Sequence, residues 1–301
     1  MTQTIPPLAL ERPALSTVTE LLKPITWFPP MWAFACGVIS SGLTTDGRWP
    51  LIITGVLLAG PLVCATSQAV NDWFDRHVDA INEPHRPIPS GRMPGRWGLY
   101  IAIGWTLLSM LVALALGPWG FAAATLGLVL AWAYSAPPFR LKKNGWWGNA
   151  ACAVSYEGLA WVTGAAVMMG GAMPSLEALV LAGLYSVGAH GIMTLNDFKS
   201  INGDRQTGIG SLPVRLGVKR AAQVASIVMA LPQLLVAGCL LAWGHPAHAA
   251  AISVLLVIQA LLMVRFVRQP VERAVWYSGL GVTLYVAGMM VSAFAIRGVT
   301  G

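Results

Sequence analysis

Two short segments of this chain repeat one arrangement of polar residues. Residues 71–79 read Asn-Asp-Trp-Phe-Asp-Arg-His-Val-Asp, and residues 196–204 read Asn-Asp-Phe-Lys-Ser-Ile-Asn-Gly-Asp. Together they hold five of the twelve acidic residues of a chain in which only 10% of residues are charged. Crowded carboxylates repel one another, and a divalent cation relieves that repulsion; hard oxygen ligands favour Mg²⁺. The predicted metal ligands are Asp72, Asp75, Asp79, Asp197 and Asp204.

The spacing of these residues is that of a helix face, because positions i, i+3 and i+7 lie on one side. Asp72, Asp75 and Asp79 fit this pattern, with Asn71 one turn before Asp75. The second segment fits it with Ser200 at the middle position. Two such faces opposed across a bundle would repel a free anion, but they suit a diphosphate carried as its magnesium complex.

Basic residues beside the two motifs are predicted to neutralise the diphosphate, for which Arg has bidentate geometry. We expect Arg86 and Arg205 to matter most, because they lie nearest the motifs in polar loops. The full candidate set is Arg76, Arg86, Arg140, Lys142, Lys143, Lys199 and Arg205. The alternative, that these are surface ion pairs with little functional weight, fits two identically spaced motifs poorly.

The elements that position these motifs are membrane helices. The chain has 301 residues, of which 56% are apolar, and its mean hydropathy is +0.65. A helix needs roughly 20 apolar residues to cross a bilayer. Runs of that length predict an all-α integral membrane protein with about nine spans, near residues 25–45, 50–74, 97–116, 119–139, 146–170, 176–196, 219–243, 247–267 and 275–296.

The charge pattern predicts the orientation of these spans. With the N-terminus in the cytoplasm, seventeen of the nineteen basic residues fall on the inner side, as the positive-inside rule requires. The net charge of +7 therefore reflects topology and not nucleic-acid binding. Both motifs lie at the cytoplasmic ends of spans, the second and the sixth. Residues 1–24 are expected to form a cytoplasmic N-terminal segment of a single transmembrane domain, 1–301, and resemble no signal or transit peptide.

Four segments of the chain resemble the UbiA-type intramembrane prenyltransferase superfamily. They are Asn-Asp-x-x-Asp-x-x-x-Asp at 71–79, Arg-Pro-Ile-Pro-Ser-Gly at 86–91, Tyr-Ser-Ala-Pro-Pro at 134–138 and the segment 204–214. The resemblance covers nearly the whole chain, including the nine spans. In finer detail, segments 71–84 and 196–200 are similar to the chlorophyll and bacteriochlorophyll synthase branch, and segment 91–100 is closer to the enzymes of phototrophic bacteria.

This resemblance implies a central cavity and a magnesium-dependent esterification. A geranylgeranyl or phytyl group would pass from its diphosphate to the propionate of bacteriochlorophyllide, in the inner or intracytoplasmic membrane of a bacterium. In the family, two ions of Mg²⁺ and the diphosphate are bound by the positions of Asn71, Asp72, Asp75, Asp79, Asp197 and Asp204. Many relatives have an acid at Ser200, and some have one at Asn202, so the second metal is expected to have fewer protein ligands here. Proteins of the pigment pathway are possible partners.

Other side chains are predicted to act on the reacting groups. An allylic cation is stabilised by aromatic faces, for which Tyr134 and Tyr156 are candidates. The propionate is already ionised at neutral pH, so no strong base is required. Glu157, an acid inside a span, is expected either to contact the tetrapyrrole or to bond to a neighbouring helix.

Three other functions compete with this prediction. A secondary transporter also has intramembrane acids, but its sites lie near the midplane, and here both motifs lie at span ends on one side. A quinone-pathway, haem-farnesylating or chlorophyll-forming prenyltransferase would share the motifs and differ in acceptor. A pigment-binding protein without catalysis would tolerate Asp72→Asn.

Overall fold

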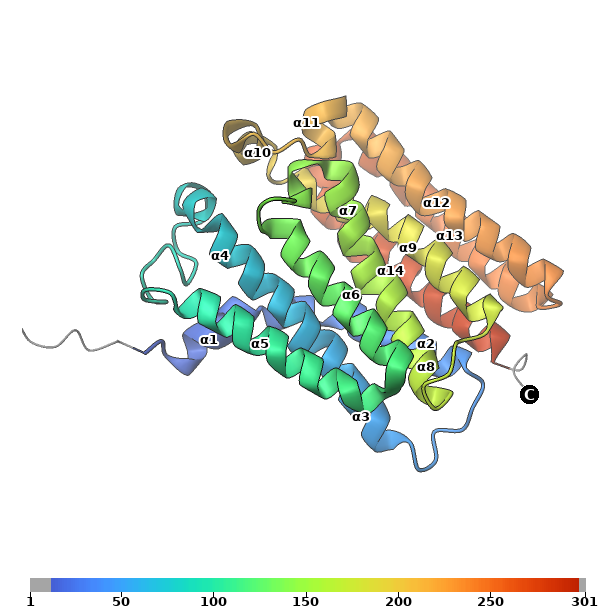
Figure 1. Ribbon diagram of the computed structural model, residues 1–301. Coiled ribbons are helices and arrows are strands. Elements are labelled where there is room, and N and C mark those ends of the chain that lie inside the picture. The colour runs from blue at the N-terminus through green and yellow to red at the C-terminus, as the bar shows by residue number, and fades with distance from the viewer. Residues whose placement is uncertain (1–11, 298–301) are drawn as a thin grey trace, which may run out of the picture.

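The computed structural model describes residues 12–297, and every regular element in that range is a helix (Figure 1). Residues 1–11 of the expected cytoplasmic segment lie outside the described residues. The elements are α1 (Leu15–Leu22), η1 (Pro24–Thr26), α2 (Phe28–Ser40), α3 (Trp49–Leu57), η2 (Leu58–Cys64), α4 (Ala65–Asn82), α5 (Trp97–Ala113), η3 (Leu114–Leu116), α6 (Gly117–Ser135), η4 (Leu141–Lys143), α7 (Gly145–Ala153), η5 (Val154–Leu159), α8 (Ala160–Met168), α9 (Leu176–Asp197), α10 (Ile201–Thr207), α11 (Leu212–Leu216), α12 (Val218–Ala242), α13 (Pro246–Arg268) and α14 (Pro270–Ile296).

Seven helical stretches within residues 12–297 are long and apolar enough to cross a membrane. One of them, Trp97–Ser135, contains both α5 and α6, which pack against each other after the chain reverses at Gly117, a glycine with a φ of 78°. A further, shorter apolar helix is Phe28–Ser40. The all-helical membrane architecture predicted from the sequence is therefore confirmed, and the positions of the predicted spans follow these helices closely.

Two of the long helices contain a π-helical segment. The helix Trp49–Ile81 has it at η2, which includes Pro61, and the helix Gly145–Met168 has it at η5. Proline lacks the N–H that a regular α-helix would use, so a local change of helix type at Pro61 has a direct cause. Both π-helical segments supply side chains to the cavity described below, including Cys64 and Tyr156.

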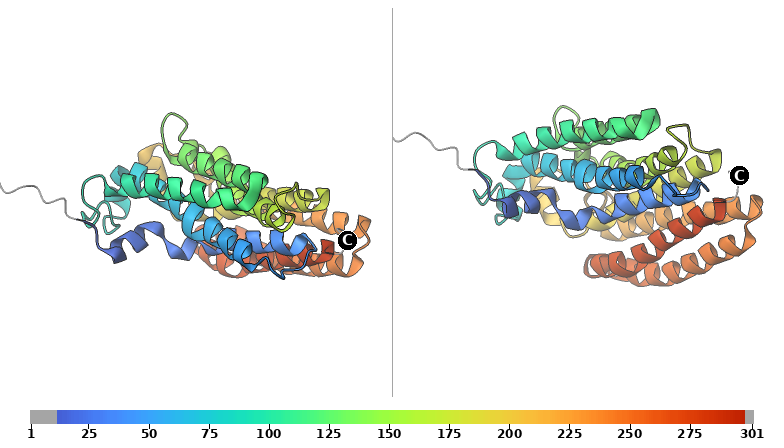
Figure 2. Two further views of the ribbon diagram at one scale, coloured as in Figure 1. Left: turned by 60° about the horizontal axis from the view of Figure 1, so that its bottom comes forward. Right: turned by 90° about the horizontal axis from the view of Figure 1, so that it is seen from below.

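The helices lie side by side in an elongated bundle (Figure 2), and α9 contacts α12, α7 and α14. Large aromatic side chains fill its interior, with Trp161, Tyr185 and Tyr285 in one apolar cluster. The loop after α4, α10 and α11 lie at one end of the bundle, at the upper left of Figure 1. The chain therefore brings the two polar motifs, which are 125 residues apart, to the same end.

The second motif differs from its predicted form. We expected Asp197, Ser200 and Asp204 on one helix face, but α9 ends at Asp197 and Asp204 lies on the separate helix α10. The break falls at residues 198–200, and Ser200, a weak helix former, stands at the N-cap of α10. The break turns α10 toward α4, which it contacts. The first motif has the predicted form, since its three aspartates all lie on α4.

Candidate active site

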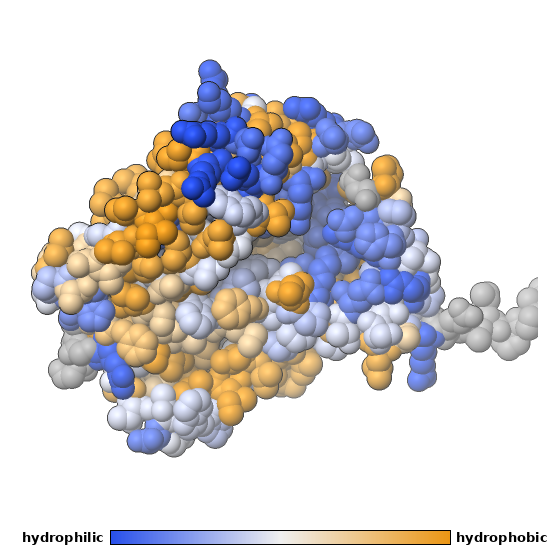
Figure 3. Space-filling view, turned by 180° about the vertical axis from the view of Figure 1, so that it is seen from behind, coloured by the Kyte–Doolittle hydropathy of each residue, from blue (hydrophilic) through white to orange (hydrophobic). Residues whose placement is uncertain are grey.

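A cavity of about 740 Å³ opens at the end of the bundle where the motifs meet. Its polar lining includes Lys23, Asn71, Arg86, Asp197 and Lys199. Its apolar lining comes from η2, α6, α9 and α14 and comprises Ala59, Val63, Leu130, Ile192 and Val282, among others. Figure 3 shows a hollow bordered by hydrophilic residues on a surface whose flanks are largely hydrophobic. The cavity thus combines a charged mouth with an apolar interior, which suits an amphipathic molecule with an anionic head.

In the first motif, every aspartate is paired with a cation. The Lys23 ammonium lies 2.6 Å from Asp72 Oδ1, and the Arg86 guanidinium lies 3.5 Å from Asp72 and 3.0 Å from Asp79. Asp75 is paired with Lys142 and, at 3.6 Å, with Arg140. Burial by itself lowers the pKa of Arg86, but Asp72, Asp79 and Glu83 together outweigh burial and raise that pKa. Of these cations, Lys23 and Arg86 line the cavity, whereas their partners Asp72 and Asp79 do not.

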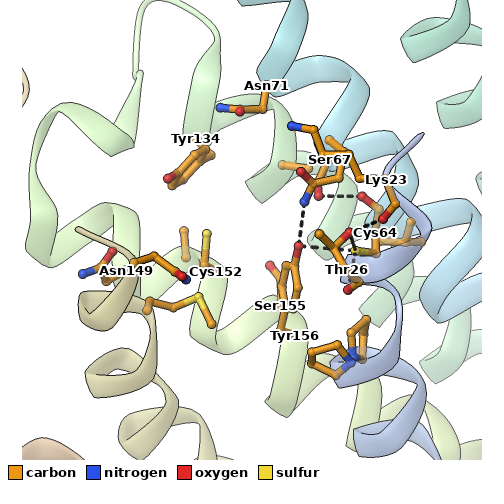
Figure 4. Close-up of a pocket in the computed structure, with 18 of the residues that line it drawn as sticks. Lys23, Thr26, Cys64, Ser67, Asn71, Tyr134, Asn149, Cys152, Ser155 and Tyr156 are labelled. Atoms are coloured by element: carbon orange, nitrogen blue, oxygen red, sulfur yellow. Dashed lines mark hydrogen bonds between the residues drawn. The ribbon is translucent and has the colours of Figure 1, made fainter. Parts of the chain in front are cut away.

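Asn71 completes the first motif by orienting one of its carboxylates. Its amide donates hydrogen bonds to Asp75 Oδ2 at 2.8 Å and to Ser135 Oγ at 3.2 Å. Asn71 also lines the cavity, beside Lys23 in Figure 4. The amide therefore fixes Asp75 from the cavity side, while Lys142 holds it from the loop side.

In the second motif, the aspartates are held by neutral donors. The Asn149 amide donates to Asp197 Oδ2 at 3.2 Å, and the Ser200 hydroxyl donates to Asp204 Oδ2 at 3.0 Å. No ion pair involves Asp197 or Asp204 within residues 12–297. Burial raises the pKa of Asp204. Asp197 lines the cavity directly, and so does Asn149, which lies on α7 (Figure 4).

Two loops join the motifs. The Gly145 N–H donates to the Gly210 carbonyl at 2.9 Å, and the Gly210 N–H donates to the Lys143 carbonyl at 3.0 Å. Glycine is required at 145, because a Cβ there would lie 2.7 Å from the backbone nitrogen of Leu212. This junction holds Lys142 against Asp75, where its positive charge also acts on Asp204. Burial lowers the pKa of Lys142, and Asp75 opposes that shift.

The remaining predicted residues divide into two groups. Tyr134 and Lys199 line the cavity, as Figure 4 shows for the Tyr134 ring. Arg76 instead donates to the Trp73 carbonyl and covers the Trp73 ring at 4.4 Å, and Arg205 is exposed on α10. Glu157 is buried in η5, away from the cavity lining. The structure therefore brings most of the predicted residues to one place, and leaves these last three outside it.

Several polar lining residues were not predicted, of which Lys23, Asn149 and Gln68 make hydrogen bonds to other lining residues or to the first motif. Lys23, which follows α1, pairs with Asp72 although 49 positions separate them. Asn149 and Gln68 are amides within apolar helices, and such isolated polar residues in predicted spans are a signal that sequence reasoning could have used. Lys23 had a weaker signal, a single lysine next to Pro24 at the start of the first span.

The donor set fits magnesium in kind. No three His, Cys, Asp or Glu side chains within residues 12–297 form a metal-binding group by themselves. Mg²⁺ does not require one, since it is commonly bound by one or two carboxylates together with substrate phosphates. Asp72 Oδ2 is buried and has no hydrogen-bond partner in the described chain, and Asp197 faces the cavity. These oxygens, one from each motif, are suitable ligands.

The sequence of this chain is similar to known proteins along most of its length. Residues 22–294 match the model of the UbiA prenyltransferase family. The chain is 58% identical to the bacteriochlorophyll synthase 33 kDa chain of Cereibacter sphaeroides, over 95% of this chain and 94% of that one. It is 38% identical to the chloroplastic chlorophyll synthase of Oryza sativa, over 92% of this chain and 75% of that one.

Solved structures share the fold. A structure described for a digeranylgeranylglyceryl phosphate synthase in membranes superposes with a TM-score of 0.72 at 19% identity, covering 93% of this chain and 98% of that one. A UbiA homologue from Archaeoglobus fulgidus, bound to GPP and Mg²⁺, gives a TM-score of 0.68 at 19% identity, with 93% and 99% covered.

Proposed function

This chain belongs to the UbiA prenyltransferase family, and we propose that it esterifies the propionate of bacteriochlorophyllide with a C20 isoprenoid, geranylgeranyl or phytyl, taken from its diphosphate. The observation that carries this proposal is the 58% identity to a bacteriochlorophyll synthase chain over 95% of the sequence. The cavity supports it, because a charged mouth that leads to an apolar interior fits an isoprenoid diphosphate.

The carboxylates of the two motifs would hold Mg²⁺, as two ions, between them. The residues are Asp72, Asp75 and Asp79 on α4, Asp197 at the end of α9 and Asp204 on α10. When bound, the metal supplies Lewis acidity that neutralises the departing diphosphate. Asn71 and Asn149 orient Asp75 and Asp197, which fixes one carboxylate of each motif.

The cations at the mouth would bind the diphosphate oxygens. Lys23, Arg86 and Lys199 line the cavity, and Arg86 already bridges Asp72 and Asp79. A guanidinium in that position contacts both a carboxylate and an incoming phosphate oxygen through separate N–H groups. Arg140 and Lys142 lie outside the cavity lining and would act by holding Asp75 in place.

The bond changes need no proton transfer. An ionised propionate oxygen forms a bond to the first carbon of the isoprenoid, while the bond from that carbon to the diphosphate oxygen breaks and its electron pair leaves with the diphosphate. The Tyr134 ring, which lines the cavity, would stabilise positive charge on the allylic carbon. The apolar lining would exclude water, which otherwise competes with the propionate.

The topology follows from the same proposal. Nine helical segments, counted over residues 12–297 with α5 and α6 apart and with α2 included, would cross the inner membrane of a bacterium, with the N-terminus in the cytoplasm. The charged mouth would then lie at the cytoplasmic surface. The whole chain would act as one transmembrane domain, alongside other proteins of the pigment pathway.

Purified protein supplied with bacteriochlorophyllide and labelled geranylgeranyl diphosphate tests the reaction directly. We expect labelled, esterified pigment with Mg²⁺ and none with EDTA. Parallel reactions with chlorophyllide and with 4-hydroxybenzoate separate the related activities. Prenylation of 4-hydroxybenzoate, or esterification of chlorophyllide, in preference to esterification of bacteriochlorophyllide would contradict the proposed acceptor.

A further inference from the structure

One wall of the cavity carries polar groups deep among apolar ones. Gln68 comes from α4, and Ser155 and Tyr156 come from the π-helical segment η5. The Gln68 amide donates to the Tyr156 hydroxyl oxygen at 3.0 Å, and the Cys64 thiol lies 3.3 Å from the same oxygen. Figure 4 shows Ser155 and Tyr156 on one side of the space that Tyr134 and Asn149 border on the other. An isoprenoid chain is a hydrocarbon and cannot form hydrogen bonds with these polar groups.

The two hydroxyls on this wall can donate to a ligand in the cavity. The Tyr156 oxygen accepts from Gln68 and from the Cys64 thiol, and the one other side chain within residues 12–297 that hydrogen-bonds to it is Ser67, whose own proton goes to the Cys64 carbonyl. The Ser155 Oγ is buried and has no partner in the described chain. Polar groups buried without partners are costly, and more so within a membrane. A ligand that accepts hydrogen bonds would satisfy both groups at once.

The depth of this wall matches the position of the reacting carbon. Gln68 precedes Asn71 by three residues and Asp72 by four, which places it on the same face of α4, about one turn or 5 Å further into the bundle. The diphosphate is bound at the level of Asp72 in the proposed reaction. The carbon attached to the diphosphate, and the nucleophile that attacks it, therefore lie close to the level of Gln68 and Tyr156.

We propose that the hydroxyls of Tyr156 and Ser155 bind the carboxylate of the acceptor and position it for attack. This inference rests on the proposed function, and it assigns to these two residues the class of ligand that they recognise. A carboxylate accepts about four hydrogen bonds, so both hydroxyls can donate to it while one oxygen faces the allylic carbon. Neutral donors orient the nucleophile, whereas the lining cations Lys23, Arg86 and Lys199 serve the diphosphate at the mouth. Gln68 is a positioning residue, because it fixes the Tyr156 oxygen.

Binding of two pigments to detergent-solubilised protein tests this assignment without catalysis. The probes are bacteriochlorophyllide and its propionate methyl ester, and the readout is the shift of the pigment absorbance on binding. We expect the wild-type protein to prefer the free acid, and Tyr156→Phe to lose roughly tenfold of that preference. Ser155→Ala should lose part of it. In turnover, Tyr156→Phe should raise the KM for the pigment and leave the KM for the prenyl diphosphate unchanged.

Tyr277→Phe is the matched control. The Tyr277 hydroxyl is also buried without a partner in the described chain, but it lies in the apolar cluster with Phe266 and outside the cavity lining. This variant should retain the wild-type preference for the free acid.

Three results would overturn the assignment. One is wild-type selectivity in both Tyr156→Phe and Ser155→Ala. Another is an equal loss of affinity for the free acid and the ester in Tyr156→Phe. A third is a defect that appears only in Tyr156→Leu, which would assign a role to the ring and not to the hydroxyl. If the wild-type protein binds neither pigment, the proposed function fails together with this inference.

Discussion

The two aspartate motifs carry similar residues at the same spacing, yet their aspartates have different interaction partners. In the first, Asp72, Asp75 and Asp79 are each paired with a lysine or an arginine. In the second, Asp197 and Asp204 receive hydrogen bonds from an amide and a hydroxyl, and no ion pair reaches them within residues 12–297. Sequence similarity between the motifs therefore conceals a difference in charge balance.

This difference indicates that the two motifs have different roles in binding the diphosphate and the metal. Around the first motif, four carboxylates, including Glu83, are balanced by Lys23, Arg86, Arg140 and Lys142. The second motif has no ion-paired cation within residues 12–297, so its carboxylates have the greater need of a divalent cation. We infer that the first motif presents cations to the diphosphate and shares in holding the metal, while the second motif binds metal mainly through its own carboxylates.

The largest effects are expected from Asp72→Asn and Asp197→Asn. Each removes a charge from one motif and keeps the shape of the side chain, and we expect turnover to fall roughly 100- to 1,000-fold. Esterified pigment per minute is the measurement, with Asp46→Asn, in an exposed loop outside the cavity lining, as the control. If the second motif binds the metal mainly through its own carboxylates, Asp197→Asn raises the Mg²⁺ concentration for half-maximal activity more than Asp75→Asn does. The reverse order would break the comparison.

Replacing the arginine near each motif should lower turnover by very different factors. Arg86 lines the cavity and bridges two aspartates, so Arg86→Ala should lower turnover roughly 100-fold. Arg205 is exposed on α10, outside the cavity lining, so Arg205→Ala should change turnover by less than about threefold. Equal losses in the two variants would mean that the second motif supplies a cation after all.

Removal of Lys142 should affect stability more than any other single change near the motifs. Its side chain is 5% exposed, and Lys142→Met leaves Asp75 with Arg140, at 3.6 Å, as its remaining ion-pair partner within residues 12–297. Breaking a buried ion pair costs about 3–5 kcal/mol. Thermal unfolding of the detergent-solubilised protein should show a clear fall in Tm for this variant. Lys143→Met, at an exposed neighbour, should leave the Tm unchanged.

A small effect is also expected at Glu83. Its side chain is 43% exposed and pairs with Arg86 at the edge of the cavity, which both residues line. An exposed ion pair contributes only about 0–1 kcal/mol, so Glu83→Gln should change turnover by less than about fivefold. A loss as large as that of Asp72→Asn would show that Glu83 is as important to turnover as the aspartates of the first motif.

The sequence predicted the helices and the first motif well. Long apolar runs locate the membrane helices, and the spacing of Asp72, Asp75 and Asp79 on α4 follows from helix geometry alone. It could not predict the break between Asp197 and Asp204, because Ser200 lowers helix propensity without forbidding a helix.

Long-range pairing was the part that sequence reasoning missed. Lys23 reaches Asp72 across 49 positions, and only the packing of α1 on α4 brings the two together. Local pattern ranked Arg86 and Arg205 equally, ahead of Arg76, but Arg86 lines the cavity whereas Arg205 is exposed on α10 outside the lining. Such choices depend on the direction in which each side chain leaves its helix.

The central claim is that both motifs hold one magnesium diphosphate between them. Calorimetric titration of the purified protein with a non-reactive thiolodiphosphate analogue of the isoprenoid substrate, with and without Mg²⁺, tests this most directly. We predict Mg²⁺-dependent binding to the wild-type protein and its loss in both Asp72→Asn and Asp197→Asn. Wild-type, Mg²⁺-dependent affinity in either variant would contradict the account.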